Sequence, residues 1–127
     1  MSSQLTISGS YVIAPLTGAS ANGEPTISTP FDEMIITDRS TLVELRLTSD
    51  AAESVAFGGV DEAVFIAIHA SGGKVSATLT SADGTDQIIP VDPIGLLLSE
   101  SVPFTALSLT RATGTTVDVR VVLADKA

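Results

Sequence analysis

The chain contains a single histidine, His69, which is the first residue to consider in a search for catalytic chemistry. With one histidine and no cysteine, the chain cannot assemble a zinc site of the usual composition. A serine–histidine–aspartate triad would have to use His69, but the segment nearest to a nucleophile elbow, residues 18–23, has one residue too many and lies in a loop. We therefore interpret His69 as a histidine near the end of a strand, at a rim or an interface.

Acidic residues offer two further candidate sites. Residues 83–86 (Asp-Gly-Thr-Asp) resemble part of a calcium-binding loop, but the other carboxylates and the bidentate glutamate of that loop are missing. A hairpin turn explains this segment better, because Gly84 can supply a positive φ angle. Carboxylates such as Asp32, Asp38 and Asp61 could pair for acid–base catalysis, but nothing favours this over solvated surface charge. With no dinucleotide-binding or phosphate-binding glycine motif either, we expect no enzyme, no metal and no cofactor.

Charge and composition narrow the classes of function further. The 127 residues include six basic and 15 acidic ones, for a formal net charge of −9, so nucleic acid and anionic membranes should repel the chain. No apolar run approaches the ~18 residues that span a bilayer. The N-terminus lacks the basic and apolar regions of a secretory signal. The chain has no tryptophan and one tyrosine, which argues against stacking on sugars or nucleobases.

The segments that carry these residues have the pattern of β-strands. In residues 116–123, Val117, Val119, Val121 and Leu123 share one face, as in a strand with one buried side. Further strands are expected at residues 4–8, 10–14, 34–36, 42–48, 64–70, 74–80, 87–91 and 104–110. The only helical turns expected are at residues 49–55 and 94–100. Short turns separate the strands, so we expect an all-β fold, an antiparallel β-sandwich or jelly-roll-like barrel of about eight strands.

The length predicts a single β domain over residues 1–127. Residues 1–30 are expected to include an N-terminal arm and a long loop, since residues 15–30 are rich in glycine, proline and small side chains. Residues 76–85 and 106–115 share a Leu-Thr pair, an alanine and a final Gly-Thr. This similarity predicts two hairpins with the same turn chemistry.

Residues 94–98 (Ile-Gly-Leu-Leu-Leu) form an apolar run without alternation. Two interpretations stay open: the segment is buried on both sides of the domain, or it forms a subunit interface. The phenylalanine side chains are expected to pack in the core or in an interface. The candidate interface residues are Ile94, Leu96, Leu97, Leu98 and Phe104. With only two lysines to keep strand edges apart, the chain is expected to self-associate.

Short, acidic, cysteine-free β proteins rich in serine, threonine, alanine and valine resemble small virion structural proteins of tailed bacteriophages. The C-terminal half carries the resemblance, through residues 83–93 (DGTDQIIPVDP), the leucine run, residues 104–110 and the final valine-rich strand. Within that group the nearest analogy is with capsid decoration, or cement, proteins.

The resemblance implies a non-enzymatic protein that binds and stabilises the assembled capsid through the major capsid protein. It also implies self-association, with a homotrimer favoured, and a place on the capsid surface of the virion after synthesis in the host cytoplasm. No nucleic acid or membrane partner is expected. The alternative is a β-sandwich binding module of a tail fibre or an adhesin.

Overall fold

The structure, a computed structural model, describes residues 3–13 and 27–127 and contains β-strands but no helix within them. The strands in these residues are β1 (Ser3–Ile13), β2 (Ile27–Thr37), β3 (Ser40–Leu47), β4 (Glu53–Ser54), β5 (Phe65–Ser71), β6 (Val75–Ser81), β7 (Asp86–Val91), β8 (Ile94–Leu98), β9 (Phe104–Arg111) and β10 (Val117–Ala124). They form three sheets, ordered β1-β2, β3-β10-β5-β8 and β4-β9-β6-β7. The expected all-β fold is confirmed.

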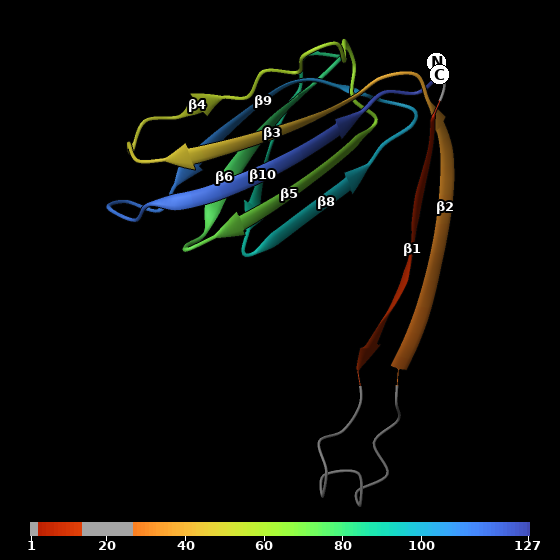
Figure 1. Ribbon diagram of the computed structural model, residues 1–127, viewed down its shortest axis with the longest axis horizontal. Helices are drawn as coiled ribbons and strands as arrows, with labels where there is room; N and C mark the ends of the chain where they lie inside the picture. The colour runs from red at the N-terminus through yellow and green to blue at the C-terminus, as the bar shows by residue number, and fades with distance from the viewer. Residues whose placement is uncertain (1–2, 14–26) are drawn as a thin grey trace, which may run out of the picture. The chain divides into compact units, whose positions relative to one another are not determined.

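The chain divides into two compact units, one formed by Gln4–Ile36 and the other chiefly by Thr37–Ala127. In the first unit, β1 and β2 run side by side in opposite directions (Figure 1). Each strand has 11 residues, about twice the usual length of five to six. Of the loop expected at residues 15–30, residues 27–30 belong to β2, and residues 15–26 lie outside the described part. The single domain with an N-terminal arm stays a prediction.

The second unit is a sandwich of two four-stranded antiparallel sheets, which lie over one another in Figure 1. Along the chain, successive strands alternate between the two sheets, and only the β6–β7 connection stays within one sheet. This order, β3-β10-β5-β8 over β4-β9-β6-β7, is that of an eight-stranded jelly roll. The sandwich of about eight strands expected from the sequence is therefore confirmed.

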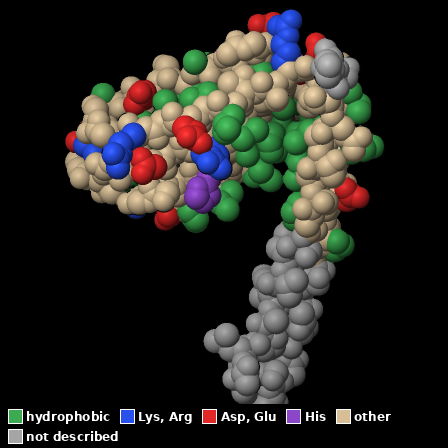
Figure 2. Space-filling model, viewed as in Figure 1, with side chains coloured by type: hydrophobic (Ala, Val, Ile, Leu, Met, Phe, Trp, Pro, Cys, Tyr) green, Lys and Arg blue, Asp and Glu red, His purple; other side chains and the backbone are tan. Residues whose placement is uncertain are grey.

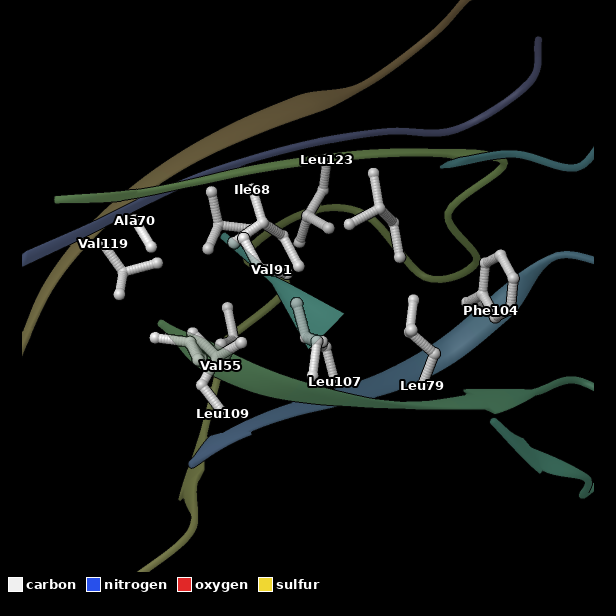
Figure 3. Packing of buried hydrophobic residues seen from close by; sticks show 14 of the residues in the cluster. Val55, Ile68, Ala70, Leu79, Val91, Phe104, Leu107, Leu109, Val119 and Leu123 are labelled. Carbon is white, nitrogen blue, oxygen red and sulfur yellow. The ribbon is translucent and has the colours of Figure 1, made fainter. Parts of the chain in front are cut away.

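The core lies between the two sheets, where their inward side chains meet (Figure 3). Ile68 and Leu123 come from one sheet, and Leu79, Leu107 and Leu109 come from the other. Each of these side chains is buried. Burying a leucine or an isoleucine removes enough apolar surface from water to contribute about 1.5–3 kcal/mol.

The strands predicted from residue 42 onward agree with the structure to within two residues at each end. The two strands predicted at residues 4–8 and 10–14 are instead one strand, β1, up to Ile13, with residue 14 outside the described part, and residues 34–36 belong to the longer β2. Both predicted helical turns are wrong. Residues 94–98 form strand β8, and residues 49–55 contain a bend followed by the short strand β4. In residues 49–55, contacts with residues far along the chain replace the predicted helical turn. Asp50 accepts a hydrogen bond from Gly114 in the turn between β9 and β10, and Glu53 pairs with Leu109 in the β4–β9 ladder.

The two similar segments share turn chemistry but not topology. Gly84 and Gly114 both have a positive φ, of 89° and 79°. Residues 76–85 form the expected hairpin, and Asp83 closes its turn by accepting a hydrogen bond from the Thr85 N–H at 3.0 Å. Residues 106–115 instead connect β9 in one sheet to β10 in the other, so the second hairpin is not formed.

Asp50 is the residue that anchors the β9–β10 turn. Its Oδ1 accepts hydrogen bonds from the Gly114 N–H and from the Arg111 Nε, each at 3.0 Å. Arg111 Nη2 lies 3.0 Å from the same oxygen. The hydrogen bond from Gly114 and then the charge of Arg111 hold the pKa of Asp50 below its ordinary value of 3.8. Asp50 therefore stabilises the fold in its ionised form.

We expect D50N to lower the free energy of unfolding at neutral pH, because the charge that favours these contacts is lost. A lowered pKa stabilises the fold above the ordinary carboxyl range and loses that effect as the pH falls through the folded-state value. The difference between D50N and the wild type should therefore shrink in acid, as measured by urea unfolding at several pH values.

The matched control for this series is D61N. The Asp61 carboxylate is solvent-exposed and lies 3.8 Å from Arg39, so D61N should behave like the wild type at every pH. A D50N deficit that stayed constant from neutral to acidic pH would contradict the role given to the Asp50 charge.

Candidate functional site

The outer face of sheet β3-β10-β5-β8 gathers side chains from four strands into rows. In the antiparallel registers, Leu42 of β3 lies beside Val122 of β10, Val122 beside Ala67 of β5, and Ala67 beside Leu96 of β8. Residues directly opposite one another point to the same face of a sheet, so these four side chains form one row across it. None of the four belongs to the core cluster, which places the row on the outside.

This row is the centre of an apolar patch, which we define as Leu42, Ala67, Ile94, Leu96, Leu98 and Val122. Leu42 is 59% exposed and Leu96 is 52% exposed, and Ile94 is also largely in solvent. Figure 2 shows hydrophobic side chains clustered on this face of the sandwich, next to a more polar area. Adjoining exposed apolar side chains on several strands mark an interaction surface more often than scattered single ones do.

A polar hollow lies on the same sheet beside the apolar patch. Glu44, Arg46, His69, Asp118 and Arg120 help to line it, and its volume is about 540 Å³. Arg120 pairs with Glu44 at 3.0 Å, and Arg46 pairs with Asp118 at 3.2 Å. Both arginines are thus already engaged by carboxylates, although exposed pairs of this kind are worth only about 0–1 kcal/mol. A polar ligand could compete for them.

His69 lies on the outer face of β5, in register with Arg120 of β10 and Ile94 of β8. Its side chain is exposed, and no described residue forms a hydrogen bond or an ion pair with the imidazole. No cluster of three or more potential metal ligands occurs in residues 3–13 and 27–127. His69 thus lies on the outer face of an inner strand, and its interpretation as a rim or interface residue stays a prediction.

The five candidate interface residues occupy different environments. Ile94, Leu96 and Leu98 point outward from β8 and belong to the apolar patch, whereas Leu97 points inward against the core. Phe104 is only 3% exposed and is part of the core, so it offers almost no surface to a partner.

Sequence reasoning did not identify the other members of the patch. Leu42 and Val122 occupy positions that alternation assigns to the polar face of their strands, alongside Glu44 and Arg120. An apolar side chain at a position where alternation predicts a polar one was the sequence feature that could have indicated these two patch members.

Gly95 allows β8 to lie close to the core. A Cβ at this position would be 2.9 Å from Cγ2 of Val91, a fully buried β-branched side chain with little freedom to move. This close approach to Val91 explains why a glycine stands at the inward position between Ile94 and Leu96.

We expect G95A to lower the free energy of unfolding by about 1–3 kcal/mol, as overpacking of a filled core does. The measurement is urea denaturation. V91A removes the methyl groups that the new side chain would meet, so G95A should cost less in a V91A background than in the wild type. Equal costs in both backgrounds would show that the contact with Val91 is not the cause.

No protein-family model, no curated protein and no solved structure matches this chain. A search of the described residues for a helix long and apolar enough to cross a membrane found none.

Proposed function

We propose that this chain is a non-enzymatic structural protein of a bacteriophage virion. In this proposal it is a decoration, or cement, protein that binds the major capsid protein on the surface of the assembled capsid and stabilises it. It is made in the host cytoplasm and self-associates, and a homotrimer is the state that the sequence resemblance implies. The proposal requires no catalytic residue, metal or cofactor.

The observation that carries the proposal is the β1–β2 hairpin. Its strands of 11 residues form a two-stranded sheet, to which no third strand is added in the described residues. Met34, which is 61% exposed, and Ile36 project from the same side of β2. A two-stranded ribbon is marginally stable in water and gains stability when a further strand or surface covers it. A capsid surface can supply such a cover by strand addition or by apolar contact.

The eight-stranded jelly roll supports the proposal, since viral capsid domains often use this architecture. The same fold also carries lectins and cupins, so the fold alone assigns no function. It is the combination of a jelly roll, a long hairpin with exposed apolar residues and the resemblance in the C-terminal half that favours a virion role.

Such a protein would act by mass action. A ligand that binds only the assembled lattice stabilises it by RT ln(1 + [L]/Kd), which is about 2.7 kcal/mol per site at a hundredfold excess over Kd. Many sites on one capsid multiply this effect without any chemical step.

The polar hollow is the observation that favours the alternative, a binding module of a tail fibre or an adhesin. Its arginine, histidine and carboxylate side chains could recognise a polar ligand on a host surface. Substitution of Arg120 in the hollow would then abolish attachment to cells, whereas a decoration protein would keep its capsid binding after the same change.

The direct test of the decoration role is to mix the purified protein with capsids that lack it. We expect the protein to co-sediment with the capsids, to add ordered density to their outer surface in electron micrographs, and to raise their temperature of disruption. Binding to tails or to host cells instead of capsids would favour the alternative.

A second prediction concerns the hairpin. M34K should weaken capsid binding by on the order of tenfold or more, because a buried contact would have to desolvate a charge. The control is I88K on β7, where the isoleucine is 71% exposed and the same change adds the same charge to the other unit. Both variants should keep the wild-type thermal midpoint. Equal binding by M34K and the wild type would exclude this face of β2 from the contact.

A further inference from the structure

The two sheets of the sandwich end in four edge strands, and three of these are protected against pairing with another chain. β4 has only two residues, and one of them is Glu53. β7 contains Pro90, which lacks an N–H, and begins with Asp86. β3 carries Glu44 and Arg46 on its outer face. Short length, proline and charged side chains are the usual means by which natural edge strands avoid association.

The fourth edge strand, β8, has none of these protections. Its residues, Ile94 to Leu98, include no charged side chain and no proline, and its pairing with β5 continues without a bulge. The only glycine, Gly95, is needed for the inward contact with Val91. An uncharged, regular, apolar edge is the type of strand that most readily adds a further strand.

The backbone groups available on this edge follow from the β5–β8 ladder. Pro93 C=O accepts from the Ala70 N–H at 2.7 Å, and the Ser99 N–H donates to Val64 C=O at 2.8 Å. Antiparallel pairs alternate between bonded and non-bonded, so between these two bonds the odd-numbered residues of β8 bond to β5. The N–H and C=O groups of Ile94, Leu96 and Leu98 therefore point away from β5, and no described residue hydrogen-bonds them.

We propose that β8 pairs with β8 of a second copy of this chain, antiparallel, about a two-fold axis that passes beside Leu96. In this register Leu96 meets Leu96 of the second copy, and Ile94 meets Leu98 of the second copy. Every outward N–H and C=O of the three residues then finds a partner. The two four-stranded sheets become one sheet of eight strands, and the two apolar patches join on its outer face.

The absence of charge from β8, together with the self-complementary register, favours a second copy as the occupant. A chain with a net charge of −9 repels its own copies, so self-association is least opposed at a strand whose own residues carry no carboxylate. β8 is such a strand. A cationic partner would be recognised by acidic side chains, and the residues of β8 offer none. The pairing is also isologous, since the same residues act on both sides, as a two-fold interface requires.

The charged residues at the two ends of the proposed β8–β8 pairing predict how dimerisation depends on salt. The register brings Asp92 opposite Glu100 of the second copy, and Lys126, 3.6 Å from Glu100 in its own chain, offsets only part of that repulsion. Added salt screens like charges, so dimerisation should become tighter as the ionic strength rises. A dimer that dissociates in salt would contradict this register.

This inference goes beyond the proposed function and does not depend on it. It predicts a particle of twice the chain mass of 13.0 kDa, whereas the resemblance implies three chains. A chain that pairs through β8 could still decorate capsids, and a chain that fails to pair could still bind them. The outcomes of the two sets of experiments are therefore distinguishable.

The first test compares L96K with L42K by sedimentation equilibrium over a range of concentrations. Both leucines are outward and more than half exposed, so both variants should fold, which circular dichroism can check. L96K places two like charges at the two-fold axis and should weaken dimerisation by at least about tenfold. L42K alters the same face on β3 and should leave dimerisation within about threefold of the wild type.

The second test uses the absence of cysteine from the chain. In the proposed register the Leu96 Cα atoms of the two copies lie about 5.5 Å apart, within disulfide range. L96C should therefore form a covalent dimer under mild oxidation, and L42C should remain largely uncrosslinked. A wild-type monomer at all concentrations, a trimer, equal loss of association in L96K and L42K, or no crosslinking of L96C would each overturn the proposal.

Discussion

The interior between the two four-stranded sheets is the constraint on which the rest of the structure depends. Leu79, Leu109, Val121 and Leu123 are fully buried there, and the longer strands of both sheets contribute alternate residues to the same layer. Because side chains alternate along a strand, a shift of one residue would move the whole inward set to the solvent side. The core therefore fixes the register of the strands that contribute to it, and with it the residues on the outer faces of the sandwich and the direction in which the backbone groups of β8 point.

Outward apolar residues are not a by-product of this constraint. The alternation that serves the core is satisfied when the other face is polar, as it is at Glu44, Arg46, Asp118 and Arg120. Leu42, Val122 and Leu96 depart from it at adjoining positions on neighbouring strands. In β8 the departure extends to the whole strand, at a sheet edge where charged or proline residues protect the other three. Exposed apolar surface is costly to leave in water and an open strand edge can pair with a further strand, which is the basis for proposing a partner here.

Much of the fold follows from the sequence, because alternation records which face of a strand is buried. Val117, Val119, Val121 and Leu123 predicted β10, and all four are core residues. The helical turn predicted at residues 49–55 does not form, because Asp50 accepts a hydrogen bond from Gly114, 64 positions further along the chain. The residues around Asp50 do not predict a contact with a residue so far along the chain. Residues 94–98 lacked alternation, and only the pairing of β8 with β5 separates their inward from their outward members.

The candidate surface was predicted only in part, for a related reason. Ile94, Leu96 and Leu98 were predicted as interface residues because they belong to one apolar run. Leu42, Ala67 and Val122 lie in three other strands and form no such run. The jelly-roll order brings these strands together, and it depends on crossings between sheets that no local pattern specifies. Phe104 shows the converse: a large aromatic residue can serve a core or an interface equally well, and only its burial distinguishes them.

The distribution of cations restricts how this protein can bind any partner. None of its six basic residues precedes Arg39, so the hairpin unit carries only carboxylates as charged side chains. Five of the six, all in the described sandwich unit, are already in ion pairs of 3.0–3.8 Å with the chain's own carboxylates. Recruiting them would mean breaking those pairs and leaving an excess of negative charge. The proposed associations therefore rely on apolar side chains and main-chain groups, which β8 and the exposed face of β2 both present.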